Sequence, residues 1–163
     1  MTDLKTLYEQ DIAAWSKQQA EALRAAGRGG SNQPLDWENL AEEIEDLGIS
    51  QRSALRSQII RIIQHLAKLE HSPSVEPRNG WRRTIRLARL QAQRRIQDNP
   101  SLKPELGRFI ADETSRGIEL AIADLEEHGE VDELDAIVLR RTAYTEGMCW
   151  ATGSPRSRCG SAA

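Results

Sequence analysis

The sequence predicts an all-α fold, an antiparallel up-and-down bundle of four to five main helices with a short C-terminal helix. Apolar residues recur at the three- and four-residue spacing of amphipathic helices through most of the 163-residue chain. Glycines, prolines and helix-capping residues interrupt that pattern at short intervals. No stretch shows the sustained alternation of a half-buried strand, and no Asn-Gly turn joins two apolar runs.

The first predicted helix spans residues 3–26, where apolar side chains follow one helical face. Thr2 or Asp3 can cap its start, and Gly27 follows its end. A polar loop then leads to Pro34.

Two further helices are predicted before the next break. One spans residues 36–47, with Asp36 as its cap and Gly48 where a C-terminal cap belongs. The other begins at Ser50 and must end before the stretch 73–77, which begins and ends with proline.

The second half of the chain holds three more predicted helices. The fourth spans 79–98 and is broken at Pro100, after which Ser101 caps a fifth that ends before Gly129. A shorter sixth helix is predicted over Glu133–Arg141. Sequential helices joined by short loops are antiparallel neighbours.

Composition limits the class of protein further. The chain is 39% hydrophobic with a mean hydropathy of -0.59 and has no uncharged apolar run near the ~18 residues of a membrane span. Its start lacks a basic leader and an apolar stretch, and both cysteines, Cys149 and Cys159, fall near the end. We therefore expect a cytoplasmic protein with no membrane contact, built as one helical domain over residues 1–150 with a mobile tail over 151–163.

Several short stretches together resemble the DUF29 family, a bacterial domain family of unknown function. They are LYEQD at 7–11 with Trp15, LDWENLAEEIEDLG at 35–48, IQHLAKL at 63–69, GWR at 80–82 and NPSL at 99–102. The resemblance implies an all-helical fold, and it brings no activity, substrate or catalytic residue. Where family members carry Pro-Tyr-Thr near their end, this chain has Ala143, Tyr144 and Thr145.

Three side chains form a candidate metal site. Asp11 falls within the apolar face of the first predicted helix, so its carboxylate needs a cation, hydrogen bonds or a metal. Glu43 borders the apolar stripe of the second helix, and His65 flanks that of the third. If Asp11, Glu43 and His65 converge and find a fourth ligand, they suit a divalent metal and a metal-binding or hydrolytic function. The alternative is structural: Asp11 bonded to the indole of Trp37, a basic side chain or a backbone amide, and His65 an ordinary hydrogen-bonded histidine.

Charge is divided into blocks along the chain. Residues 51–95 hold eleven Lys and Arg against two acids, and residues 105–135 hold eleven acids against two arginines. Residues 36–46 add six acids and no base. Basic and acidic helices can lie side by side and pair their charges. Alternatively, the fourth helix offers Arg82, Arg83, Arg86 and Arg89 to phosphates or to an acidic protein partner.

These patterns leave three hypotheses for function. The first is a non-enzymatic interaction protein that uses its segregated charge to bind a protein partner or a second copy of itself. The second is the metal-binding or hydrolytic bundle. The third is nucleic-acid binding through the four arginines, against which stand the pI of about 5.7 and the absence of aromatic residues between the basic ones. No nucleophile elbow, phosphate-binding loop, dinucleotide fingerprint or zinc motif is present, which argues against an enzyme, and no cofactor is predicted.

The bundle hypothesis also predicts which large side chains meet. We expect Tyr8, Trp15, Ile44, Leu66 and Ile85 to share one dry interior, because each lies on the apolar side of its helix.

Overall fold

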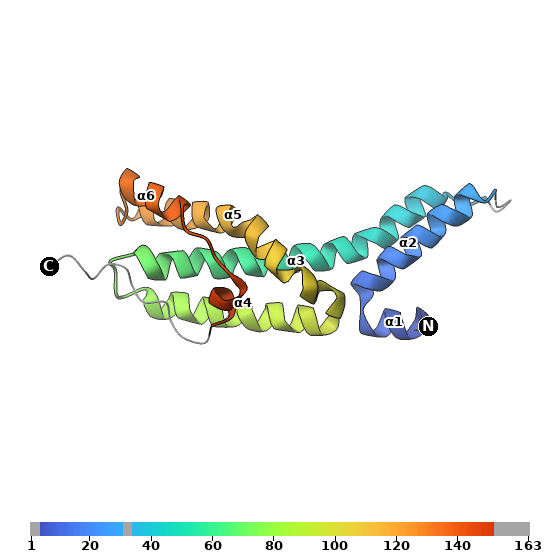
Figure 1. Cartoon of the computed structure of the whole chain (residues 1–163), viewed down its shortest axis with the longest axis horizontal. Coiled ribbons are helices and arrows are strands. Elements are labelled where there is room, and N and C mark those ends of the chain that lie inside the picture. Colours follow the sequence, from blue (N-terminus) through green and yellow to red (C-terminus); the bar gives the residue numbers. More distant parts are fainter. Residues whose placement is uncertain (1–3, 31–33, 152–163) are drawn as a thin grey trace. The chain divides into compact units, whose positions relative to one another are not determined.

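The computed structural model describes residues 4–30 and 34–151, and every regular element in those ranges is a helix (Figure 1). The predicted all-α class is confirmed. The elements are α1 (Leu4–Gln10), α2 (Ile12–Arg28), α3 (Trp37–His71), α4 (Arg78–Asp98), the 3-10 helix η1 (Pro100–Glu105), α5 (Leu106–Glu127), α6 (Glu133–Arg140) and α7 (Glu146–Trp150). None of the described helices is both long and apolar enough to cross a membrane.

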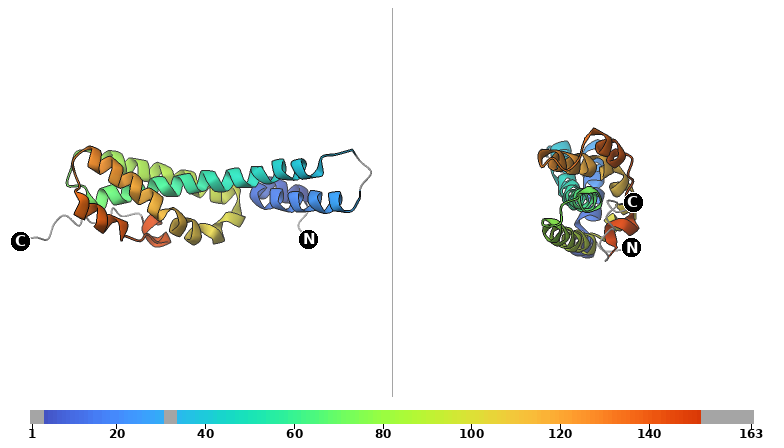
Figure 2. Two further views of the ribbon diagram at one scale, coloured as in Figure 1. Left: turned by 90° about the horizontal axis from the view of Figure 1, so that it is seen from above. Right: turned by 90° about the vertical axis from the view of Figure 1, so that its left-hand side faces the viewer.

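The described residues form two compact units. The first contains those up to Leu55 together with Arg94–Glu105, and the second contains Arg56–Gln93 and those from Leu106 onward. Within the first unit, α2 lies antiparallel beside the first half of α3; within the second, α3, α4 and α5 alternate in direction (Figures 1 and 2). The predicted antiparallel packing is confirmed. A single domain over 1–150 stays a prediction, and the predicted mobile tail lies, apart from Ala151, outside the described residues.

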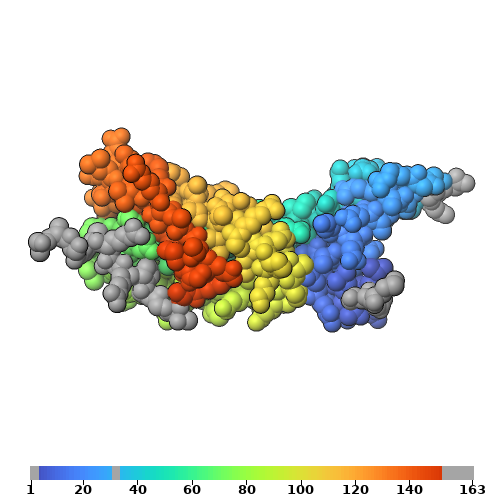
Figure 3. All heavy atoms as spheres, viewed as in Figure 1, coloured from blue at the N-terminus to red at the C-terminus, as the bar shows by residue number. Residues whose placement is uncertain are grey.

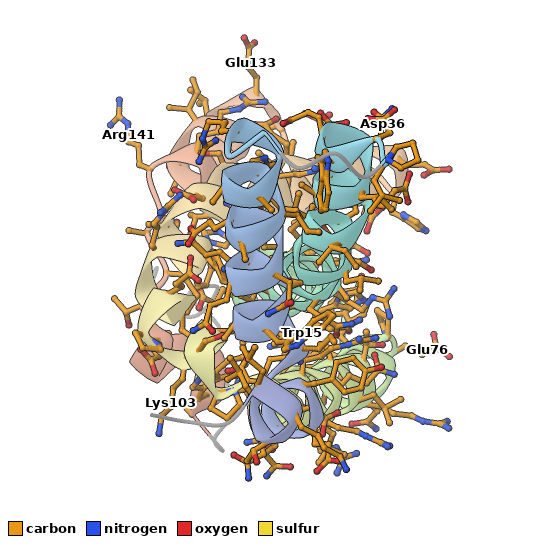
Figure 4. All side chains as sticks on the ribbon, turned by 90° about the vertical axis from the view of Figure 1, so that its right-hand side faces the viewer. Trp15, Asp36, Glu76, Lys103, Glu133 and Arg141 are labelled. Atoms are coloured by element: carbon orange, nitrogen blue, oxygen red, sulfur yellow. The ribbon has the colours of Figure 1, made fainter. Side chains whose placement is uncertain are left out.

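The predicted helix over 3–26 is wrong in one respect, because the chain breaks at Asp11 into α1 and α2. Asp11 leaves the helical conformation at φ -159° and ψ 85°, and its Oδ1 accepts the backbone N–H of Ala14 at 2.8 Å. Aspartate is a strong N-cap, since its carboxylate satisfies an amide that the first turn leaves free. Trp15 follows on α2 (Figure 4), where its ring meets that of Tyr8 edge-to-face at 4.9 Å between centroids.

The second and third predicted helices are one continuous helix, α3, and Gly48 is not its end. Gly48 is buried where α3 meets α2, and a Cβ there would meet the hydroxyl of Ser16 and lie 3.2 Å from the carbonyl oxygen of Ala13. The glycine therefore allows close packing between helices and does not terminate one. Asp36, which precedes α3 (Figure 4), accepts the backbone N–H of Asn39, as predicted for a cap.

The later elements follow the predictions more closely. Helix α4 matches the predicted 79–98, and α6 matches the predicted sixth helix. In the structure, Asp132 is the N-cap of α6. Ser101 does not begin α5; it lies in η1, and α5 starts five residues later at Leu106. Helix α7 was not predicted. The segment that carries α6 and α7 covers part of the second unit (orange to red in Figure 3).

Most of the large buried side chains belong to the second unit. Large aliphatic residues of α3, α4 and α5 fill the second unit, among them Leu66 and Ile85, which are both 3% exposed. The expectation that these two share one interior with Tyr8 is wrong, because Tyr8 is 53% exposed. Trp15 and Ile44 are half-buried in the first unit. The physical reason is the break at Asp11, which turns α1 away from the helical face on which Tyr8 was predicted.

Candidate functional site

The exposed side of α4 combines two arginines with two leucines. Arg83 and Arg86 are exposed, and Leu87 and Leu90 are 51% and 61% exposed. Since successive helical residues turn by about 100°, these four side chains lie on the side opposite Ile85, which is buried. Neither arginine has a hydrogen bond or ion pair with any residue in the described ranges. We call Arg83, Arg86, Leu87 and Leu90 the α4 face.

The other two arginines predicted to bind a partner are engaged within the chain. Arg82 is half-buried, and its Nη1 donates to Oδ1 of Asn79 at 3.3 Å. Arg89 is half-buried, and its Nε donates to the carbonyl oxygen of Cys149 at 2.6 Å. Burial lowers the pKa of Arg89. The predicted set is therefore divided. Arg83 and Arg86 are exposed and have no ion pair within the described ranges, whereas Arg89 connects α4 to α7 through its hydrogen bond.

Cys149 carries no chemistry suited to a nucleophile. Its side chain is fully buried in α7, and burial raises the pKa of the thiol to about 12. At neutral pH the sulfur is protonated and inaccessible, and only a thiolate attacks or binds a metal.

Basic residues of α3 are paired with acidic residues of α5, so the internal-pairing interpretation of the charge blocks is confirmed for these helices. Arg56 contacts Glu113 and Asp112, each at 2.6 Å, and lies 5.0 Å from the ring centroid of Phe109. Burial opposes charge on Arg56, but its hydrogen bonds to both carboxylates outweigh that effect and raise its pKa. These arginine–carboxylate contacts fix the register of α3 against α5.

Lys68, nearer the C-terminal end of α3, makes a similar ion pair with an acid of α5. Its Nζ lies 2.8 Å from Oδ2 of Asp124, which also accepts a hydrogen bond from Gln64. The Lys68 ammonium lies 5.1 Å from the ring centroid of Trp81. Burial opposes ionisation of Asp124, yet the hydrogen bonds from Lys68 and Gln64 hold its pKa below the usual value.

The first half of α3 presents an acidic surface. Glu38 and Glu45 are bound by Arg24 of α2, at 3.2 and 2.7 Å. The remaining acids of this stretch are exposed and have no ion pair with any residue that the structure describes. Leu40 and Leu47 lie among them and are 41% and 43% exposed. We call the following residues the α3 acidic face: Leu40, Glu42, Glu43, Asp46 and Leu47.

The three candidate metal ligands differ in their surroundings. Asp11 is 6% exposed and accepts the backbone N–H of Ser101 at 2.6 Å and its hydroxyl at 2.9 Å, besides the amide that it caps. Glu43 is exposed, and half-buried His65 has its Nδ1 2.9 Å from the carbonyl oxygen of Arg61. Burial lowers the pKa of His65. Among the described residues, no group of three His, Cys, Asp or Glu side chains is placed to hold a metal. The metal site stays a prediction, and the structural role foreseen for Asp11 through backbone amides is observed.

A polar network at the end of α3 was not predicted. Ser72 and Ser74 both donate their hydroxyls to Glu130, Ser74 at 2.8 Å. Burial opposes ionisation of Glu130, but the two hydroxyls outweigh it and lower its pKa. Arg78 donates to the carbonyl oxygen of Leu69 at 2.6 Å and so satisfies the last turn of α3. No local pattern signals the contacts of the two serines with Glu130, because Glu130 lies more than fifty residues later in the chain.

Comparisons with known proteins agree with this fold. One solved structure, an alpha-helical protein of unknown function from Rhodospirillum rubrum ATCC 11170, is similar with a TM-score of 0.63 and 24% identity over 91% of each chain. At that identity the likeness concerns the fold alone. A comparison with curated proteins finds no match. The family model described as "Domain of unknown function DUF29" matches residues 7–134. With most of its length matched, and with the helical architecture that the resemblance implied, the chain belongs to the DUF29 family.

Proposed function

We propose that this protein is a non-enzymatic interaction module that binds an acidic protein surface through the α4 face. The observation that carries the proposal is the contrast between paired and unpaired cations. Arg56 and Lys68 of α3 are held by acids of α5, whereas Arg83 and Arg86 have no ion pair within the described ranges. Guanidinium groups bind carboxylates through two parallel hydrogen bonds, which favours an acidic partner.

The leucines of the α4 face support a protein partner over a nucleic acid. Leu87 and Leu90 lie beside the arginines, and an apolar centre with a charged rim is typical of protein–protein interfaces. None of the four residues of this face has an aromatic ring on which a base could stack, and a phosphate-binding surface has no need of two exposed leucines. Nucleic acid is therefore the competing outcome of the test.

The test uses a fluorescein-labelled synthetic helix with Leu and Glu on one face, and anisotropy with the full chain as the readout. We expect R83E/R86E to weaken binding by about tenfold or more, since charge reversal on the face repels the peptide. The matched control is R108E/R116E, which makes the same change in net charge at two exposed positions of α5 and leaves binding within about twofold.

Two further ligands decide between partners. A peptide with Gln in place of Glu is expected to bind much more weakly, because it cannot pair with the guanidinium groups. Equal binding of the two peptides contradicts the proposal. Tighter binding of duplex DNA than of the acidic peptide, with an affinity that falls steeply with salt, would favour the nucleic-acid function instead.

A further inference from the structure

We infer that the acidic surface bound by the α4 face is the α3 acidic face of a second copy of this chain. The inference rests on the proposed function and names its partner. Both faces are exposed, and each carries charges without an ion pair within the described ranges. A molecule that displays a basic and an acidic face of the same construction can bind its own copies.

Charge complementarity is the first argument. The α4 face offers Arg83 and Arg86, and the α3 acidic face offers Glu42, Glu43 and Asp46. The choice of acids is specific, because Glu38 and Glu45 on the same helix are already occupied by Arg24 of α2. Unpaired carboxylates on one copy therefore meet unpaired guanidinium groups on the other.

Apolar side chains on both faces are the second argument. Leu87 and Leu90 are 51% and 61% exposed on α4, and Leu40 and Leu47 are 41% and 43% exposed on α3. Leucines one or two turns apart on each helix can interdigitate when two helices pack 8–10 Å apart, with the charges around them. Burying these leucines supplies attraction, while the charges select the orientation and exclude like faces.

The expected association is weak and salt-dependent. One face of one helix from each copy buries less area than stable complexes need, so dimers are expected to dissociate on dilution. Raising the salt from about 0.1 M to about 1 M shortens the screening length from about 10 Å to about 3 Å and weakens the charge pairing.

Sedimentation analysis of the full chain over a range of concentrations tests the inference with two matched charge reversals. R83E/R86E makes both faces acidic, and E43K/D46K makes both faces basic. We expect each variant alone to self-associate at least about tenfold more weakly than the wild type. An equimolar mixture of the two is expected to form mixed oligomers, because each supplies the face that the other lacks. R108E/R116E is expected to associate as the wild type does.

Three results would overturn the inference: a wild-type chain that is monomeric at every concentration and salt, variants that associate as well as the wild type, or a mixture without mixed oligomers. The peptide assay separates this failure from that of the proposed function. If the wild type is monomeric but still binds the acidic peptide, and R83E/R86E weakens that binding, only the second copy as partner is ruled out. If peptide binding is absent as well, both proposals fail.

Discussion

The two units of this protein hold helices together by different means. Between α2 and the first half of α3, the buried residues are small: Ala13, Ser16, Ala20, Ala41 and Gly48. In the second unit, the interior is built of large side chains, including Ile59, Ile62, Ile63, Phe109 and Ile122. Small residues bring backbones close but remove little apolar surface from water, whereas large ones bury much more per residue. The contact between α2 and α3 therefore depends more on caps and close backbone approach, with Leu55 and Leu102 as the large buried side chains elsewhere in the first unit, whereas the second unit depends on packed apolar volume.

Truncating one large side chain in each unit gives the largest expected difference. Ile122→Ala in the second unit removes a residue that is 2% exposed, and we expect a loss of about 2–5 kcal/mol from transfer and cavity terms together. Leu47→Ala in the first unit truncates a side chain that is 43% exposed, with an expected loss below about 1 kcal/mol. Denaturant unfolding of both variants measures the difference, and equal losses would contradict the contrast between the two units.

Removing an aspartate cap tests the first unit's dependence on polar contacts. Asp11→Ala deprives Ala14 and Ser101 of their shared acceptor at a site that is 6% exposed, so we expect a loss of about 1–3 kcal/mol. Asp36→Ala is the matched control, because Asp36 also caps a helix of this unit but is exposed, and its loss should stay below about 1 kcal/mol. Thermal unfolding followed by circular dichroism compares them, and a D11A variant as stable as D36A would contradict the role of Asp11.

Acid sensitivity gives the smallest effect and concerns the second unit. Hydrogen bonds from Lys68 and Gln64 hold the pKa of Asp124 below its value in the unfolded chain, so its contribution is present above the unfolded pKa of about 4. That contribution is lost as the pH falls through the lowered pKa of the folded state. Asp124→Asn should therefore make the loss of stability between about pH 5 and about pH 2 smaller than in the wild type. Unfolding across this range measures it, with Asp46→Asn, an exposed carboxylate without a partner among the described residues, as control. An identical pH dependence in D124N and wild type would show that Asp124 does not contribute to the acid sensitivity.

The candidate site could be predicted only in part. Exposure of Arg83 and Arg86 follows from helical periodicity, because both lie away from the apolar stripe of α4. Occupation of Arg89 could not be foreseen, since its partner is the carbonyl oxygen of Cys149, sixty residues later in an unpredicted helix. The pairing of basic α3 with acidic α5 was one of two interpretations that charge blocks alone left open, and contacts such as Arg56 with Glu113 decided between them.

The helical class, most helix positions and the division of charge follow from the amino-acid sequence, because these depend on neighbours within about four residues along a helix. The packing of distant segments decided that Asp11 ends one helix and begins another, since its carboxylate also binds Ser101, ninety residues away. It likewise decided that Gly48 continues α3, because the space for a side chain there is taken by α2. Local periodicity carries no information about contacts that distant segments make only when the chain is folded.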